Sequence, residues 1–133
     1  DWTPLARNFQ MELFRRVFAD ELDGLREWVE AIVRSVPEGR CDADLVYTKK
    51  LRRHPADYVN NPPHVAAAKI KGGNPRRISY FITRDGPQPA GQVEATLDYE
   101  HYIDRQLQPA AEGILQEVGI DFVRLASRQG WLL

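Results

Sequence analysis

Apolar side chains recur at helical spacing at both ends of this 133-residue chain, and that spacing restricts the folds it can adopt. In the first series they stand three or four residues apart, which predicts a helix from about Pro4 to Ala19 with Thr3 as its N-cap. A second series of the same period, Leu25 to Val36, ends just before Pro37. Because only a short connection joins the two, we expect them to pack as a helical hairpin.

A further apolar stripe of the same kind predicts a long helix from near Asp98 to Val118. Pro109 lies inside this stretch and cannot donate a backbone hydrogen bond, so we expect a kink near Arg105. A short final helix is expected from about Asp121 to Ser127. Helices are therefore predicted to dominate both ends of the chain.

The middle of the chain has the turn residues and apolar runs of short strands. Strands are expected at about 45–48 and 78–83. Between them we expect a turn or one helical turn after Pro55 and a small alanine-rich helix from Val65 to Ile70, and after them a turn at Asp85-Gly86-Pro87. The predicted fold class is α+β and mainly α-helical, with a helical hairpin, a long kinked C-terminal helix and a small β element.

Size and composition favour one compact domain over residues 1–133. The apolar runs are only a few residues long, far below the roughly 20 of a membrane span, and no secretory signal is recognisable. The lone cysteine, Cys41, cannot form an internal disulfide or a zinc ribbon, so a soluble cytoplasmic protein is expected. Because the chain opens on Asp1 and its only methionine is Met11, we expect a segment excised from a larger protein.

The formal net charge of −1 conceals a strong segregation of charge along the chain. Residues 45–87 contain nine of the 18 Lys and Arg residues and two of the 19 acidic residues, a formal charge of +7. Residues 1–44 and 88–133 each carry −4. A local positive potential of this size attracts polyanions even when the whole chain is nearly neutral. Phosphate-rich partners are therefore the leading candidates.

The densest charge lies between Lys49 and Arg53, where four cations occur within five residues. Five more basic residues lie in the same acid-poor stretch, and folding could gather them on one side: Lys69, Lys71, Arg76, Arg77 and Arg84. A groove along a phosphate backbone needs this arrangement, because neutralised phosphates release condensed counterions. Cations that contact phosphates fix position without reading bases, so largely sequence-independent binding is expected. A merely solvated surface is the alternative interpretation of this charge.

No pattern in the chain predicts catalysis or metal binding. Glu100 and Asp104 are four residues apart on one helical face, but no nucleophile or histidine ligand at an established spacing accompanies them. The three histidines are scattered, and Gly72-Gly73 forms no phosphate-binding loop. We therefore predict no catalytic residue, no metal site and no cofactor within this chain.

Three stretches in a fixed order resemble landmarks of the family B DNA polymerases, most of all the bacterial members. The first, Thr48 to Pro55 followed by Tyr58 and by Pro63-His64-Val65, is similar to the segment that enters the thumb subdomain. Ile78 to Ile82 and Leu97 to Pro109 look like the next two landmarks in the same order. Each motif alone is weak, but their order and spacing are specific.

The ends of the chain extend this resemblance. Asp1 to Leu5 is similar to the junction of the palm and thumb subdomains, and Gln129 to Leu132 looks like the carboxyl end of the family. Arg52 departs from the family pattern, which often has Thr or Ser there. Asp42-Ala43-Asp44 has the spacing of the palm carboxylates, but the family pattern places it before the thumb strand, and we interpret it as a solvated turn.

The resemblance implies a non-catalytic thumb subdomain that grips primer-template duplex DNA for a DNA-directed DNA polymerase, a nucleotidyltransferase of DNA replication and repair. The partners would be that duplex and the palm and other subdomains of the parent, near the nucleoid, with no membrane involved. Magnesium would be held by palm carboxylates of the parent. The resemblance and the charge together predict these DNA-binding residues: Thr48, Lys49, Lys50, Leu51, Arg52, Arg53, Tyr58, His64, Lys69, Lys71, Arg76 and Arg77.

Two other functions stay open from the residues alone. The same basic surface suits a small RNA- or ribosome-associated module, although the chain lacks an aromatic RNP-like strand and a Gly-x-x-Gly loop. It also suits a non-catalytic interaction domain that binds an acidic protein. Salt-dependent binding of duplex DNA would distinguish a DNA-binding thumb subdomain from these two alternatives.

Overall fold

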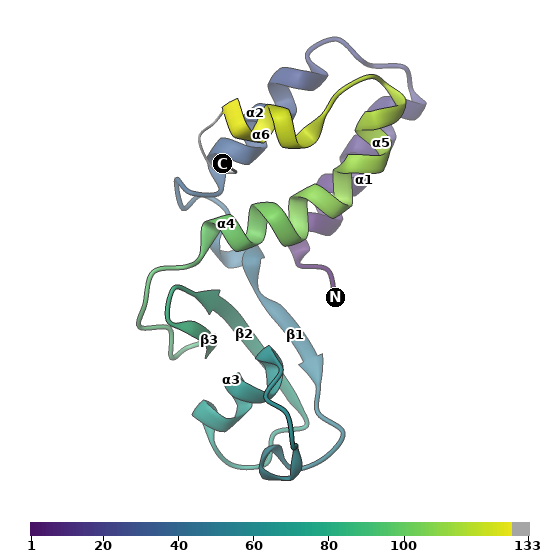
Figure 1. The fold of residues 1–133 in the computed structure, drawn as a ribbon. Helices are drawn as coiled ribbons and strands as arrows, with labels where there is room; N and C mark the ends of the chain where they lie inside the picture. The colour runs from purple at the N-terminus through teal and green to yellow at the C-terminus, as the bar shows by residue number, and fades with distance from the viewer. Residues whose placement is uncertain (129–133) are drawn as a thin grey trace. The chain divides into compact units, whose positions relative to one another are not determined.

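A computed structural model describes residues 1–128 (Figure 1). Two compact units are present: a sheet unit of Asp1 with residues 46–98, and a helical unit of residues 2–45 with 99–128. Helices make up 53% of these residues beside a three-stranded antiparallel sheet, which confirms the mainly helical α+β class. The organisation as a single domain stays a prediction. The stretch Gln129 to Leu132, which resembles the family's carboxyl end, lies outside the described residues.

Seven helical segments form the helical unit as far as residue 128. They are α1 Pro4–Phe18, α2 Leu25–Ser35, the 3₁₀ turn η1 Asp42–Leu45, α4 Tyr99–Tyr102, the π-helical turn η3 Ile103–Leu107, α5 Gln108–Glu117 and α6 Phe122–Arg128. The predicted helices are confirmed to within one or two residues at each end. Their apolar period is a local property of the sequence, so no tertiary information was needed to locate them.

The start of α1 has the predicted cap. The Thr3 hydroxyl accepts a hydrogen bond from the Ala6 N–H at 3.2 Å, and Pro4 occupies the first turn. Thr3 is itself fully buried. Its N–H and its hydroxyl donate to Gln106 Oε1 at 2.8 and 3.0 Å, which satisfies these polar groups away from water. The capping residue is therefore fixed by a side chain 103 positions later in the sequence.

In the predicted helical hairpin, Trp28 of α2 contacts two side chains of α1. The Phe9 and Trp28 rings stack with centroids 5.4 Å apart, and the Arg16 guanidinium lies 4.5 Å from the Trp28 centroid. Along its length, however, α1 runs beside α5, where Ala110 and Ala111 are buried and small enough for a close approach (Figure 1). The hairpin is thus only part of a layer of helices within this unit.

The expected kink near Arg105 takes the form of a π-helical turn. In place of one continuous helix, α4, η3 and α5 follow one another, and the Gln108 N–H bonds to the Ile103 carbonyl five residues back. Pro109 has no N–H, and its ring would crowd the carbonyl of Arg105 in a regular α-helix. Widening the helix by one residue removes that conflict.

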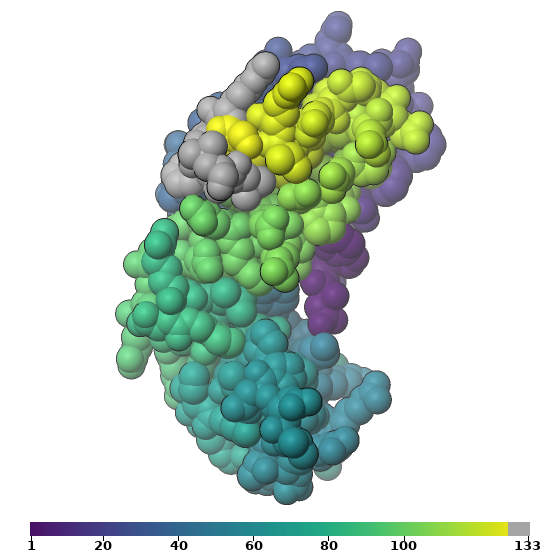
Figure 2. All heavy atoms as spheres, in the orientation of Figure 1, coloured from purple at the N-terminus to yellow at the C-terminus, as the bar shows by residue number. Residues whose placement is uncertain are grey.

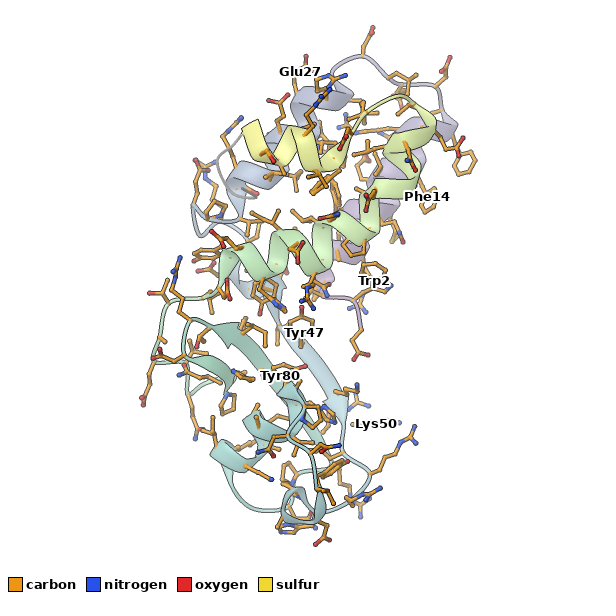
Figure 3. All side chains as sticks on the ribbon, in the orientation of Figure 1. Trp2, Phe14, Glu27, Tyr47, Lys50 and Tyr80 are labelled. Atoms are coloured by element: carbon orange, nitrogen blue, oxygen red, sulfur yellow. The ribbon has the colours of Figure 1, made fainter. Side chains whose placement is uncertain are left out.

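The sheet unit contains three strands, one helix and one 3₁₀ turn. In chain order these are β1 Tyr47–Lys50, η2 Pro55–Asp57, α3 Pro63–Lys71, β2 Arg77–Thr83 and β3 Gly86–Pro89. The central strand β2 pairs antiparallel with both of the others. The helix α3 packs against β2 and β3, with Val65 and Ala68 buried. Tyr47 and Tyr80, labelled in Figure 3, stack between neighbouring strands with centroids 5.3 Å apart.

The strands differ from the prediction in two respects. The first strand covers 47–50 instead of about 45–48, because Leu45 is buried in the η1 turn and pairing with β2 extends through Lys50. A third strand, β3, was not predicted, and it begins within the expected turn at Asp85-Gly86-Pro87. It contains Pro87 and Pro89, which cannot donate ladder hydrogen bonds and are therefore tolerated only at the edge of a sheet, where β3 lies.

Within residues 1–128, the helices are all too short or too polar to cross a membrane.

Candidate nucleic-acid interface

A basic hollow lies where the β1–β2 pair ends, and it is the feature of the sheet unit with the most concentrated charge. Its volume is about 690 Å³. It is lined by Lys49, Lys50, Leu51, Arg52, Arg53, His54, Asn74, Pro75, Arg76 and Arg77. Six of these ten residues are Lys or Arg and none is acidic. In Figure 2 the blue-teal chain at the end of β1 stands out from the body of the sheet unit.

Strand pairing brings the two halves of the basic hollow together. The Leu51 N–H donates to the Arg76 carbonyl at 2.8 Å, which prolongs the β1–β2 ladder by one residue beyond Lys50. Leu51 is buried, whereas its basic neighbours on both sides are exposed. The apolar residue that interrupts the run of cations therefore anchors the chain, and the cations project into solvent around it.

Lys50 and Arg77 are cross-strand partners, so two like charges stand opposite each other. Opposed like charges destabilise a sheet. Both side chains are exposed, and neither has an acidic side chain within 4.0 Å among the described residues. Figure 3 shows Lys50 extending away from the end of β1. An arrangement of this kind is relieved when an anion binds between the two side chains.

The next pair along the same face is Thr48 and Ser79. Their hydroxyl oxygens are 3.0 Å apart, which places two further hydrogen-bonding groups beside the opposed cations. Successive residues of a strand face opposite sides, so Lys49 points to the other face. There its ammonium lies 3.2 Å from the carboxylate of Asp1.

The loop after β1 is held in place by a tyrosine. The Arg52 N–H donates to the Tyr58 hydroxyl at 2.9 Å, and the Arg53 guanidinium lies 5.1 Å from the centroid of the Tyr58 ring. His54 caps the η2 turn, because its Nδ1 accepts from the Ala56 N–H at 3.1 Å. The two arginines are thus attached to a structured turn.

Five of the predicted DNA-binding residues do not line the hollow. Thr48 lies one position before it, and Tyr58 lies behind the loop that forms one side. Lys69 donates to Asn61 Oδ1 at 2.6 Å, and Lys71 is the last residue of α3. The fifth, His64, is only 9% exposed and meets the Tyr58 ring edge-on at 6.1 Å.

The environment of His64 favours its neutral form. Burial, and secondarily the positive charge of Lys49, lower the pKa of His64 below its ordinary value. A buried neutral imidazole at the first turn of α3 supports packing of the loop that carries Tyr58. The structure therefore places His64 in the interior of the sheet unit and outside the lining of the basic hollow.

Sequence reasoning missed three residues of the hollow. His54 follows directly after the cation cluster, and Asn74 and Pro75 directly precede Arg76. The sequence signal that could have identified them is their position directly beside predicted DNA-binding residues. Only strand pairing shows that residues 74–77 face residues 49–54 across one space.

Two of the acidic residues named in the sequence, Asp104 and Asp42, are each engaged by a neighbouring side chain. Asp104 pairs with the neighbouring Arg105 at 3.0 Å on an exposed surface. Asp42, in the η1 turn, accepts a hydrogen bond from the Tyr99 hydroxyl at 3.0 Å, and burial together with this carboxylate raises the pKa of Tyr99. Over the described part of the chain, no three His, Cys, Asp or Glu side chains gather as they would around a metal ion.

Comparison with known proteins identifies the relatives of this chain. No protein-family profile matches it. It is 43% identical to DNA polymerase II of Escherichia coli K12 over 142 residues, covering 97% of this chain and 18% of that protein. DNA polymerase 2 of Aeropyrum pernix is 32% identical over 152 residues, covering all of this chain and 19% of that protein.

A solved structure shows the same fold. The family B DNA polymerase from the archaeon Pyrobaculum calidifontis superposes with a TM-score of 0.75 at 23% identity, covering 91% of this chain and 18% of that one. The chain therefore spans less than a fifth of the length of these relatives. The resemblance of the sequence to family B DNA polymerases is confirmed, including its likeness to a bacterial member. Over nearly its whole length, this chain is homologous to a segment of the family B DNA polymerases.

Proposed function

We propose that this chain is the thumb subdomain of a DNA polymerase and that it holds primer-template duplex DNA without reading its sequence. The observation that carries this proposal is the basic hollow, which is lined by six Lys and Arg residues and by no acidic residue, although Lys49 is also paired with Asp1. Homology to family B DNA polymerases supports duplex DNA as the polyanion.

Retention of the duplex follows from the electrostatics of the hollow. Lys and Arg side chains that neutralise phosphates release condensed counterions, which favours binding whatever the base sequence. Slower release of the product duplex would let the parent enzyme add more nucleotides in each encounter. Nucleotidyl transfer itself would take place elsewhere in the parent, at palm carboxylates that hold magnesium.

The salt dependence of binding tests this function directly. Labelled primer-template DNA is titrated with the chain at several salt concentrations. With about 3 to 5 phosphates contacted, the logarithm of the binding constant should fall against the logarithm of salt with a slope of about −3 to −4.5. A duplex of unrelated base sequence should bind equally well.

Charge reversal in each unit supplies a matched pair of variants. Lys50→Glu, in the basic hollow, should weaken duplex binding about tenfold or more and make the salt slope shallower by about 1. Arg40→Glu changes the net charge by the same amount in the helical unit, where Arg40 is exposed, and should leave the affinity nearly unchanged.

Other outcomes identify other functions. Tighter binding of single-stranded RNA than of duplex DNA would favour an RNA-associated module. No nucleic-acid binding even at low salt would favour an acidic protein partner. Equal loss of binding in the two variants would show that the basic hollow is not the binding surface.

A further inference from the structure

We infer that Tyr58 is a positioning residue of the basic hollow. It holds Arg52 and Arg53 where they can contact phosphates. This inference rests on the proposed function. It assigns Tyr58 a role different from direct contact with nucleic acid, since Tyr58 does not itself line the hollow. Its influence on binding would pass through the two arginines.

The hydroxyl of Tyr58 fixes the backbone of the loop. It accepts the hydrogen bond of the Arg52 N–H at 2.9 Å, six residues earlier in the sequence. Leu51, one residue before, is already tied to β2 through the Arg76 carbonyl at 2.8 Å. Two consecutive N–H groups are therefore satisfied within the sheet unit, and the Arg52 side chain leaves the backbone from a defined place.

The ring of Tyr58 fixes the neighbouring side chain. The Arg53 guanidinium lies 5.1 Å from the ring centroid, within the range of a cation–π interaction. Such a contact orients a long, flexible side chain that has no acidic partner among the described residues. Arg53 is exposed and lines the hollow, so it stays available to a phosphate while it is held.

The position of the ring argues against base stacking. Arg53 lies over one face of the Tyr58 ring, the His64 ring is nearly perpendicular to it with centroids 6.1 Å apart, and the Tyr58 hydroxyl accepts the Arg52 N–H. A stacked base would have to displace Arg53 from that face. The Tyr58 N–H also donates to the Pro55 carbonyl of the η2 turn at 3.3 Å, and His64, whose ring packs against that of Tyr58, is buried.

Two substitutions separate the contributions of the hydroxyl and the ring. Tyr58→Phe keeps the ring and removes only the hydrogen bond to Arg52, and should weaken duplex binding about threefold with the salt slope unchanged. Tyr58→Leu also removes the contact with Arg53. It should weaken binding about tenfold and make the slope shallower by about 1, as expected for the loss of one phosphate contact.

A matched control distinguishes this effect from general loss of a tyrosine hydroxyl. Tyr99→Phe removes a hydroxyl that bonds Asp42 in the helical unit, and should leave the affinity and slope unchanged. Thermal unfolding followed by circular dichroism is measured for every variant. Affinities are compared only at temperatures where each variant is fully folded.

Removing Arg53 provides the decisive comparison. If the Tyr58 ring acts through Arg53, it should contribute little to affinity once Arg53 is absent. The affinity lost between Arg53→Ala and Arg53→Ala/Tyr58→Leu should then be no larger than the affinity lost on Tyr58→Phe in the unsubstituted chain. A merely structural role would lower affinity equally in both backgrounds, and unchanged affinity in both Tyr58 variants would also overturn the inference. If the unsubstituted chain failed to bind duplex DNA, the proposed function itself would be rejected.

Discussion

The opposed cations Lys50 and Arg77 disfavour sheet stability at the place where we propose that phosphates bind. Their register places two positive charges on adjacent strands, and no described acidic side chain lies close enough to compensate them. Leu51, in contrast, stabilises the same turn of chain by burial and by its hydrogen bond to Arg76. Charge and apolar anchoring thus have separate roles in two successive residues, Lys50 and Leu51.

Reversing one of these charges should stabilise the free protein while weakening its binding. Arg77→Glu converts the repulsive pair into an attractive one, which should raise the free energy of unfolding by about 0.5–1 kcal/mol. The same change removes a cation from the hollow and should lower duplex affinity. Urea denaturation and DNA titration measure the two effects.

Arg84→Glu is the control for this prediction. Arg84 is exposed in the same unit but does not line the hollow and is not paired across the sheet with a like charge. It should change stability little. A loss of stability in Arg77→Glu would contradict the interpretation of the Lys50–Arg77 pair as repulsive.

His64 should make stability depend on pH. Its pKa is lowered in the folded protein by burial and by Lys49, so between the folded pKa and about 6.5 the unfolded chain binds more protons. This contribution to stability is complete above about pH 6.5 and is lost as the pH falls toward the folded pKa. Urea denaturation between pH 5 and 8 should therefore show the free energy of unfolding rising with pH.

Substitution of the histidines identifies the group responsible. His64→Gln should flatten the pH dependence in this window, whereas His54→Gln, which alters an exposed histidine of the same unit, should preserve it. An unchanged pH profile in His64→Gln would show that other groups cause the dependence.

At the scale of elements, the π-helical turn connects an irregularity in one helix to the start of another. Pro109 makes a regular helix unfavourable at Arg105, and the η3 turn places Gln106 almost completely inside the helical unit. There Gln106 Oε1 accepts both hydrogen bonds from the cap of α1. The distortion that Pro109 causes in the α4–α5 segment thereby positions the side chain that fixes the start of α1.

Loss of this amide should be costly. Gln106→Leu leaves the N–H and hydroxyl of Thr3 without their acceptor in a buried place, which should lower the free energy of unfolding by about 1–3 kcal/mol. Chemical denaturation followed by circular dichroism measures the change. Gln108→Leu removes an exposed hydrogen bond to Glu112 and should cost much less. Similar losses in both variants would contradict a special role for Gln106.

Across the whole molecule, the segregation of charge along the sequence corresponds to a division between units. The cations of residues 49–77 all belong to the sheet unit, whereas most of the acidic residues belong to the helical unit. Each unit has its own core: Leu13, Val29 and Leu115 are buried in one, and Tyr80 and Val65 in the other. The segregation of charge seen in the sequence therefore coincides with the division into a sheet unit and a helical unit, which the sequence did not predict.

The amino-acid sequence by itself determined the helices, the Thr3 cap, the place of distortion before Pro109 and the excess of cations in the central third. Each of these depends on residues within a few positions of one another, so periodicity and composition were sufficient to predict it. The shift of β1 and the proline-containing edge strand β3 were not predictable in this way, because strands are defined by partners distant in sequence.

Only the tertiary structure decided which cations share one site. Strand pairing joins residues 49–54 to residues 74–77 and leaves Lys69 and Lys71 on α3, although all of them belong to the same basic stretch of sequence. The physical reason is that net charge is additive along a chain, whereas the convergence of charge depends on the register of β1 against β2 and on the anchoring of Leu51 and Tyr58.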